Sequence, residues 1–165
     1  MRKAMGKLET VLLTAAAAGV VGSLLVPASG SLALLHELVG IVPMLAGGLW
    51  LVKITVMIYN QKDWKNMLLV ACVAVVLLGF SALKIGQTAA DAAQGSQRVV
   101  LYNCDVESTM GTKGIFSLRY KLRGEDASGE RYRLHLSGSD AQKLEHMDTV
   151  TVEYYAHTKR VVVFQ

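Results

Sequence analysis

Residues 67–86 read MLLVACVAVVLLGFSALKIG, a nearly uncharged stretch whose single charge is that of Lys84. Two more apolar runs precede it, at residues 8–26 and 32–59. An α-helix needs about 20 consecutive, mostly apolar residues to cross the hydrocarbon core of a bilayer. The three runs therefore predict a three-helix transmembrane domain over residues 1–86, with helices at about 8–26, 32–59 and 67–86.

Charged residues are concentrated outside these runs. The chain has 165 residues, of which 52% are hydrophobic and 18% charged, and its formal net charge is +4. In a membrane protein such a modest basic excess is typical of residues that anchor helices at the cytoplasmic surface, so we expect no nucleic-acid partner. Cys72 and Cys104 lie in different parts of the chain, and no internal disulfide is expected.

The basic residues also predict an orientation. Arg2, Lys3 and Lys7 precede the first run, and Lys62 and Lys65 lie in the link between the second and third runs. The link at residues 27–31 carries no charge. Because basic residues near helix ends favour the cytoplasm, we predict a multi-pass protein of the cell membrane with a cytoplasmic N-terminus and an extracytoplasmic C-terminal domain.

The first run has a second interpretation. Residues 1–28 also resemble a signal peptide, with a basic start, an apolar stretch and a possible cleavage site near Ala28. We favour an uncleaved transmembrane helix because Glu9 interrupts the basic start and the apolar stretch is long for a signal. The orientation of the C-terminal domain is the same in both cases.

Small residues recur four apart in the first helix: Ala15 with Gly19, Ala18 with Gly22, and Gly19 with Ser23. This spacing lets a second helix approach closely. We expect that helix to belong to the same chain, and the alternative is a helix of another protein.

The second helix contains Pro43 and the pair Gly47-Gly48, which favour a bend, and it also contains Lys53. If the first two helices form a hairpin about residues 29–30, Glu9 lies within about one turn of Lys53. The two then form an intramembrane ion pair, which would lower the cost of a partly buried ammonium group. The alternative is that Lys53 extends to the interface alone.

No pattern for catalysis, metal binding or a cofactor is found. The pair His36-Glu37 would begin a zinc-protease motif, but residue 40, where that motif needs its second histidine, is a glycine. There is also no Cys-x-x-Cys pair for redox chemistry. We therefore expect a protein that is not an enzyme and that has no metal and no cofactor.

After a linker at residues 87–97, in which a helical extension frays at Gly95, the hydrophobic period changes to two. Alternation over residues 115–123 and 130–136, around a polar turn, predicts a hairpin. Further strands are expected at residues 98–106, 149–155 and 161–164. The spacing of Ser139 and Gln142 is that of a capping box and predicts a short helix through His146.

The order of three strands, a helix and two strands predicts a small five-stranded, barrel-like domain over residues 98–165. This order resembles that of the oligonucleotide/oligosaccharide-binding barrel. The segments Gly129-Glu-Arg-Tyr132 and Asp148-Thr-Val-Thr-Val-Glu-Tyr-Tyr155 resemble the β-rich tails of uncharacterised bacterial membrane proteins with two or three helices. That resemblance covers under half of the chain and implies no activity.

Basic residues occupy one face of the predicted hairpin, and we name them the basic stripe: Arg119, Lys121, Arg123, Arg131, Arg133 and His135. Pairing about Ala127 would place Arg123 opposite Arg131, Lys121 opposite Arg133 and Arg119 opposite His135. Like charges directly opposite each other are destabilising, which suggests a site for an anionic partner. The alternative is a solvated face that Glu125, Asp126 and Glu153 neutralise.

These features predict a non-enzymatic accessory or interaction subunit, embedded in the lipid bilayer, whose extracytoplasmic domain contacts a partner or an anionic surface. A membrane-protein partner or a homo-oligomer is expected. The alternative, suggested by Pro43, Gly47-Gly48 and Lys53, is a small transporter or channel component that works as an oligomer.

Overall fold

The computed structural model describes residues 6–110, 118–144 and 146–165. The chain divides into two compact units. The first comprises Met1–Leu25 and Glu37–Gly86, and the second comprises Val26–His36 and Gln87–Gln165. The link between the first two helices and the end of the third helix therefore belong to the same unit as the strands.

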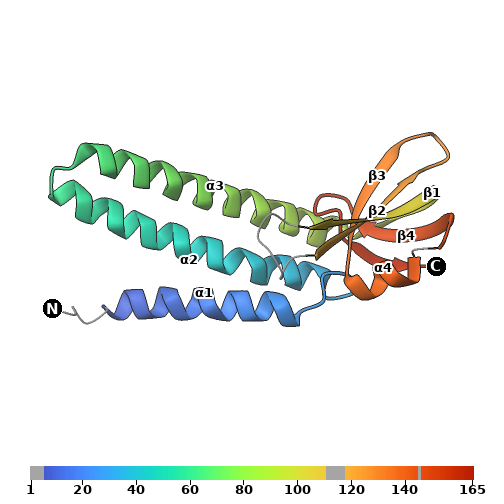
Figure 1. Cartoon of the computed structure of the whole chain (residues 1–165), viewed down its shortest axis with the longest axis horizontal. Coiled ribbons are helices and arrows are strands. Elements are labelled where there is room, and N and C mark those ends of the chain that lie inside the picture. The colour runs from blue at the N-terminus through green and yellow to red at the C-terminus, as the bar shows by residue number, and fades with distance from the viewer. Residues whose placement is uncertain (1–5, 111–117, 145) are drawn as a thin grey trace. The chain divides into compact units, whose positions relative to one another are not determined.

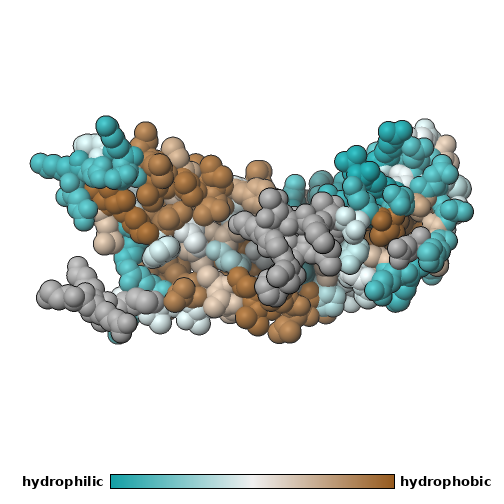
Figure 2. All heavy atoms as spheres, viewed as in Figure 1, coloured by the Kyte–Doolittle hydropathy of each residue, from teal (hydrophilic) through white to brown (hydrophobic). Residues whose placement is uncertain are grey.

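Three long helices make up most of the first unit: α1 (Lys7–Leu25), α2 (Ala33–Asn60) and α3 (Trp64–Gln94) (Figure 1). Each is long and apolar enough to cross a membrane, and at most 17% of its most apolar 18-residue window is buried. Figure 2 shows hydrophobic residues gathered over the helices and hydrophilic residues over the strands. The prediction of a multi-pass membrane protein with three apolar helices is thus supported.

The helical extension predicted within residues 87–97 is present and ends before Gly95, but the linker expected after it is reduced to that one residue. α3 continues to Gln94, and β1 (Ser96–Met110) begins after one residue, Gly95. Gly95 has a φ of +77°, and its N–H donates to the carbonyl of Asp91 at 2.9 Å. A left-handed glycine in this place ends a helix with its last carbonyls satisfied. The alanine-rich sequence before it sustains the helix up to that point.

The second unit contains a five-stranded antiparallel sheet in the order β3-β2-β1-β4-β5. The remaining strands are β2 (Leu118–Glu125), β3 (Arg131–Leu136), β4 (Thr149–Tyr155) and β5 (Val161–Phe164), and α4 (Gly138–Leu144) lies between β3 and β4 in the chain. The order of the elements along the chain is the predicted one.

The predicted barrel-like arrangement is wrong, because the five strands form an open sheet. Its two edge strands are joined only by an isolated parallel bridge between His135 and Arg160 among the residues that the structure describes. The edge of β5 also has another partner, since the N–H of Gly30 donates to the carbonyl of Val161 at 3.0 Å. Closure of a barrel would need a continuous ladder along this edge.

The register of the hairpin also differs from the prediction by two residues. Arg123 pairs with Arg133, Lys121 with His135 and Glu125 with Arg131. The turn is centred on Ser128, because the Asp126 carboxylate accepts hydrogen bonds from the N–H groups of Ser128 and Glu130, at 2.8 and 2.9 Å. These bonds, with that of the Ser128 hydroxyl foremost, lower the pKa of Asp126.

One face of the sheet packs into a hydrophobic core together with α4. The fully buried side chains of this core are mostly aliphatic, and the largest are those of Leu101, Leu122, Leu134, Leu144, Val150, Val152 and Val161. They occupy alternate positions in the strands, as period-two sequences require. The opposite face carries the charged residues considered below.

Candidate functional site

An ion pair joins α1 and α2 within their apolar segments. Lys53 Nζ lies 2.7 Å from Glu9 Oε1, and the other carboxylate oxygen of Glu9 accepts the N–H of Gly6 at 3.0 Å. At the helical rise of 1.5 Å per residue, Lys53 lies about 10 Å before the end of α2 at Asn60. An ionisable pair at this depth is a functional-site candidate by default, since isolated charges there are costly.

A second ion pair joins α2 to α3. Lys84 Nζ lies 3.8 Å from Glu37 Oε2. Between Glu37 and Lys53 the sequence of α2 carries no charged residue over about 24 Å. α2 is therefore linked to each of its two neighbours by an ion pair, at opposite ends of this uncharged stretch.

The small residues of α1 lie against α2 of the same chain at two positions. A Cβ on Gly19 would be 2.6 Å from Pro43 Cδ, and one on Gly22 would be 2.7 Å from Val39 Cγ1. Ser23 donates its hydroxyl to the Val20 carbonyl at 2.8 Å, a bond within α1, and Ala15 is half-buried. Gly19 and Gly22 thus allow the two helix backbones to approach closely.

Three residues that suggested transport have packing or pairing partners. Pro43 lies against Gly19, and Lys53 is paired with Glu9. A Cβ on Gly48 would meet Leu78 of α3 at 2.7 Å. The contacts of Pro43 and Gly48 are those of helix packing, and that of Lys53 is an ion pair between two helices.

The basic stripe lies beside acidic residues that the sequence analysis missed. Asp105 and Glu107 of β1 are opposite Arg123 and Lys121 of β2. Arg123 Nη2 lies 2.5 Å from Glu107 Oε2. Glu107 follows the end of the strand predicted at residues 98–106, and extending the alternation by one residue would have placed both acids on this face.

The three acids named as neutralising groups have different roles. Glu125 pairs with Arg131, with Oε1 and Nε 2.9 Å apart. Asp126 organises the turn, and Glu153 of β4 lies opposite Arg98 rather than beside the stripe. Of these three acids, only Glu125 forms an ion pair with a described side chain of the stripe, in addition to the pair of Glu107 with Arg123.

Two cations of the stripe are left without an ion pair among the described residues, namely Lys121 and Arg133. Arg133 is exposed and lies opposite Arg123. His135 is half-buried, and its backbone N–H donates to the carbonyl of Lys159 at 2.7 Å. The backbone of Arg119 lies opposite that of Thr109 in β1.

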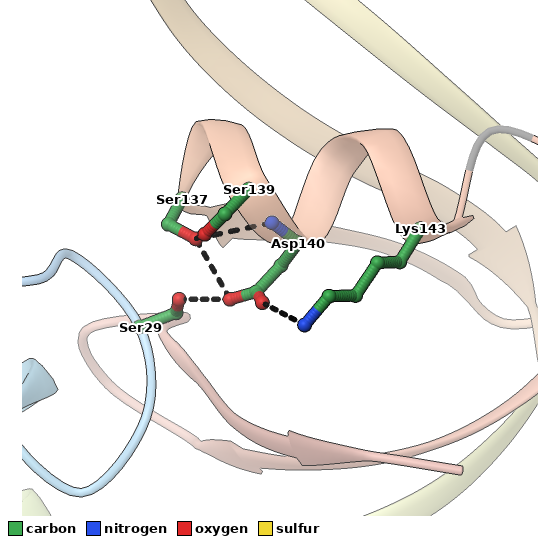
Figure 3. A network of polar contacts seen from close by, with 5 residues as sticks. All are labelled: Ser29, Ser137, Ser139, Asp140 and Lys143. Atoms are coloured by element: carbon green, nitrogen blue, oxygen red, sulfur yellow. Dashed lines mark hydrogen bonds and ion pairs between the residues drawn. The ribbon is translucent and has the colours of Figure 1, made fainter.

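A polar network surrounds the start of α4 (Figure 3). The hydroxyls of Ser29 and Ser137 both donate to Asp140 Oδ2, and the Asp140 N–H donates back to Ser137 Oγ at 3.2 Å. Ser137 is therefore the N-cap, two residues before the predicted one, because its hydroxyl oxygen accepts the N–H of Asp140 in the first turn of α4. The network contains no histidine to act as a base, and it ties the link between α1 and α2 to α4.

A buried carboxylate, absent from the sequence analysis, holds the turn between β4 and β5. Asp91 near the end of α3 is fully buried and accepts the N–H groups of His157 and Thr158, at 2.8 and 2.7 Å. The only sequence signal is an isolated acid in the alanine-rich segment 89–93.

Within the described ranges no group of three or more His, Cys, Asp or Glu residues could hold a metal ion. His36, the candidate from the incomplete zinc motif, has Nδ1 2.8 Å from the carbonyl of Val26. Burial raises the pKa of the Cys104 thiol, which makes it a poor nucleophile at neutral pH.

Comparison of the chain with protein-family models, with curated proteins and with solved structures finds no match.

Proposed function

We propose that this chain is a non-enzymatic accessory subunit of a membrane assembly, whose β domain lies outside the cytoplasm and binds a partner or surface that carries anionic groups. The observation that supports this most directly is the pair Lys121 and Arg133, which have no ion pair with any described residue on a sheet face where Arg123 and Arg131 each have one.

The register makes these two cations neighbours. Lys121 lies opposite His135 and Arg133 lies opposite Arg123, so Lys121 and Arg133 are diagonal neighbours across β2 and β3. Diagonal side chains in adjacent strands are about 7–8 Å apart, within reach of one ligand. An anionic group bound between them would also offset the repulsion between Arg123 and Arg133.

Replacing Lys121 and Arg133 together by Gln should weaken binding to anionic vesicles about 30-fold, because each basic residue near such a surface contributes about 1 kcal/mol. The full chain would be held in nanodiscs of phosphatidylcholine and mixed with vesicles containing phosphatidylglycerol. The affinity of the parent should also fall steeply with added salt.

The matched control is Arg98→Gln with Lys143→Gln, which removes two exposed cations outside the basic stripe. This control should bind like the parent. Equal loss in both double variants would show a general charge effect and contradict the site, and unchanged binding of the Lys121/Arg133 variant would do the same. Purification of the full chain in a mild detergent tests the accessory role, and a lone monomer under all conditions would count against it.

The proposed orientation has its own test. In a variant without Cys72 and Cys104, a cysteine at Ser128 should react with a membrane-impermeant thiol reagent in intact cells, whereas a cysteine at Asn60 should react only after lysis. Ser128 is exposed in the hairpin turn and Asn60 is exposed at the end of α2, so neither is shielded by the fold. The opposite labelling pattern would place the β domain in the cytoplasm.

A further inference from the structure

α1 and α2 leave an open groove between their two points of attachment. They touch where Gly19 lies against Pro43, and they are joined again by the Glu9–Lys53 pair. Between these points lies a groove of about 290 Å³. Apart from Glu9, its lining is apolar: Leu12, Leu13 and Ala16 of α1, and Ala46, Gly47 and Trp50 of α2.

The groove exists because the residues at its base are small. A Cβ added to Gly47 would meet nothing within 4 Å. One water molecule occupies about 30 Å³ in the liquid, and a methylene group is of similar size. The groove volume of about 290 Å³ therefore has room for several methylene groups. An apolar space at this depth in a bilayer is filled by hydrocarbon, because empty space forfeits the dispersion contacts of its lining.

Glu9 forms the polar end of the groove, and its ion-pair partner Lys53, about one helical turn beyond Trp50 in α2, supplies the positive charge that attracts an anion there. Both carboxylate oxygens of Glu9 already accept a hydrogen bond, from Lys53 and from Gly6. The ammonium of Lys53 has three donors, and one of them has a hydrogen-bond partner among the described residues. Its side chain is 32% exposed, so the remaining donors are accessible.

The helix lengths make this end reachable for a lipid headgroup. α1 begins at Lys7, close to the level of Lys53 along the helix pair. From Lys53, α2 continues about 10 Å further to Asn60. Among the described residues, α1 therefore starts short of the level at which α2 ends, and this difference leaves a step between the two helices. Local thinning of the bilayer at such a step brings headgroups closer to the ammonium.

We propose that this groove binds one acyl chain of an anionic phospholipid, whose phosphate accepts hydrogen bonds from Lys53. The site is separate from the basic stripe and goes beyond the accessory function. It supplies a bound lipid as a structural component between α1 and α2.

Gly47→Leu tests the groove itself. A Cβ at this position would meet no atom within 4 Å, and leucine is a better helix former than glycine, so folding should be retained while the rest of the side chain occupies the groove. Phosphatidylglycerol that co-purifies with the parent in a mild detergent, measured by native mass spectrometry, should be lost. Gly40→Leu is the matched control, since it adds the same side chain to an open position of α2 outside the groove.

Glu9→Gln with Lys53→Met tests the headgroup contact without leaving an unpaired charge. The parent should bind phosphatidylglycerol more tightly than phosphatidylcholine of the same acyl chains, and this variant should bind both equally. Equal lipid retention by Gly47→Leu and the parent would overturn the proposal. The proposal would also be overturned if a second copy of the chain occupied the groove. In that case the parent would be a dimer, and Gly47→Leu would convert it to a monomer without changing the amount of bound lipid.

Discussion

Replacing Asp91 by Ala should destabilise the β domain by about 2–4 kcal/mol, because it leaves the N–H groups of His157 and Thr158 without an acceptor. A backbone donor buried without a partner costs about 1–3 kcal/mol. One of these two hydrogen bonds is buried and the other partly buried. The measurement is thermal unfolding of the full chain in detergent, together with the rate of trypsin cleavage after Lys159.

Two variants make this result specific. Asp91→Asn keeps one acceptor oxygen and should lose less stability than Asp91→Ala. Gln94→Ala removes only the exposed contact between Gln94 Oε1 and His157 Nε2, at 3.2 Å, and should change stability by less than about 0.5 kcal/mol. If Asp91→Ala is as stable as Gln94→Ala, the buried carboxylate does not hold the turn.

Replacing Gly19 by Leu should force α1 away from α2 and lower the stability of the helical unit by about 1–3 kcal/mol or more. Even the first added carbon would lie 2.6 and 2.9 Å from two ring carbons of Pro43 and 3.0 Å from Val42 Cβ. A proline ring within a helix cannot rotate out of the way as a long side chain can. The measurement is thermal unfolding of the full chain in detergent.

Ala18→Leu is the control for this variant, because Ala18 is the exposed neighbour of Gly19 and accepts the same side chain without a clash. It should leave stability nearly unchanged. Equal effects of the two substitutions would mean that added volume in α1, rather than contact with Pro43, matters.

Helix length correctly related one pair of residues that are distant in the sequence. The proposed hairpin of the first two helices placed Glu9 near Lys53, and the structure has the two groups 2.7 Å apart. Once two antiparallel helices are joined by a short link, the rise per residue brings such positions to the same level. The hairpin register was wrong because it depends on the turn, where the hydrogen bonds of Asp126 decide which residue lies at the centre.

On the charged face of the sheet, too, the sequence predicted some features and the tertiary structure decided others. Alternation in β2 and β3 identified the basic stripe, but the ion pair of Arg123 with Glu107 depends on the pairing of β1 with β2. The order of the strands therefore decides which cations of the basic stripe have an ion pair. Sequence alternation assigns a residue to a face of its own strand and says nothing about the strand beside it.

By itself the sequence determined that this chain has three helices able to span a membrane and a β-rich domain, because hydrophobic run length and period are local properties. Tertiary structure decided the rest: the open sheet in place of a barrel, the role of Asp91 and the groove between α1 and α2. Each of these depends on backbone groups or small residues that segments distant in sequence bring together. Such contacts leave no periodic signal in the sequence.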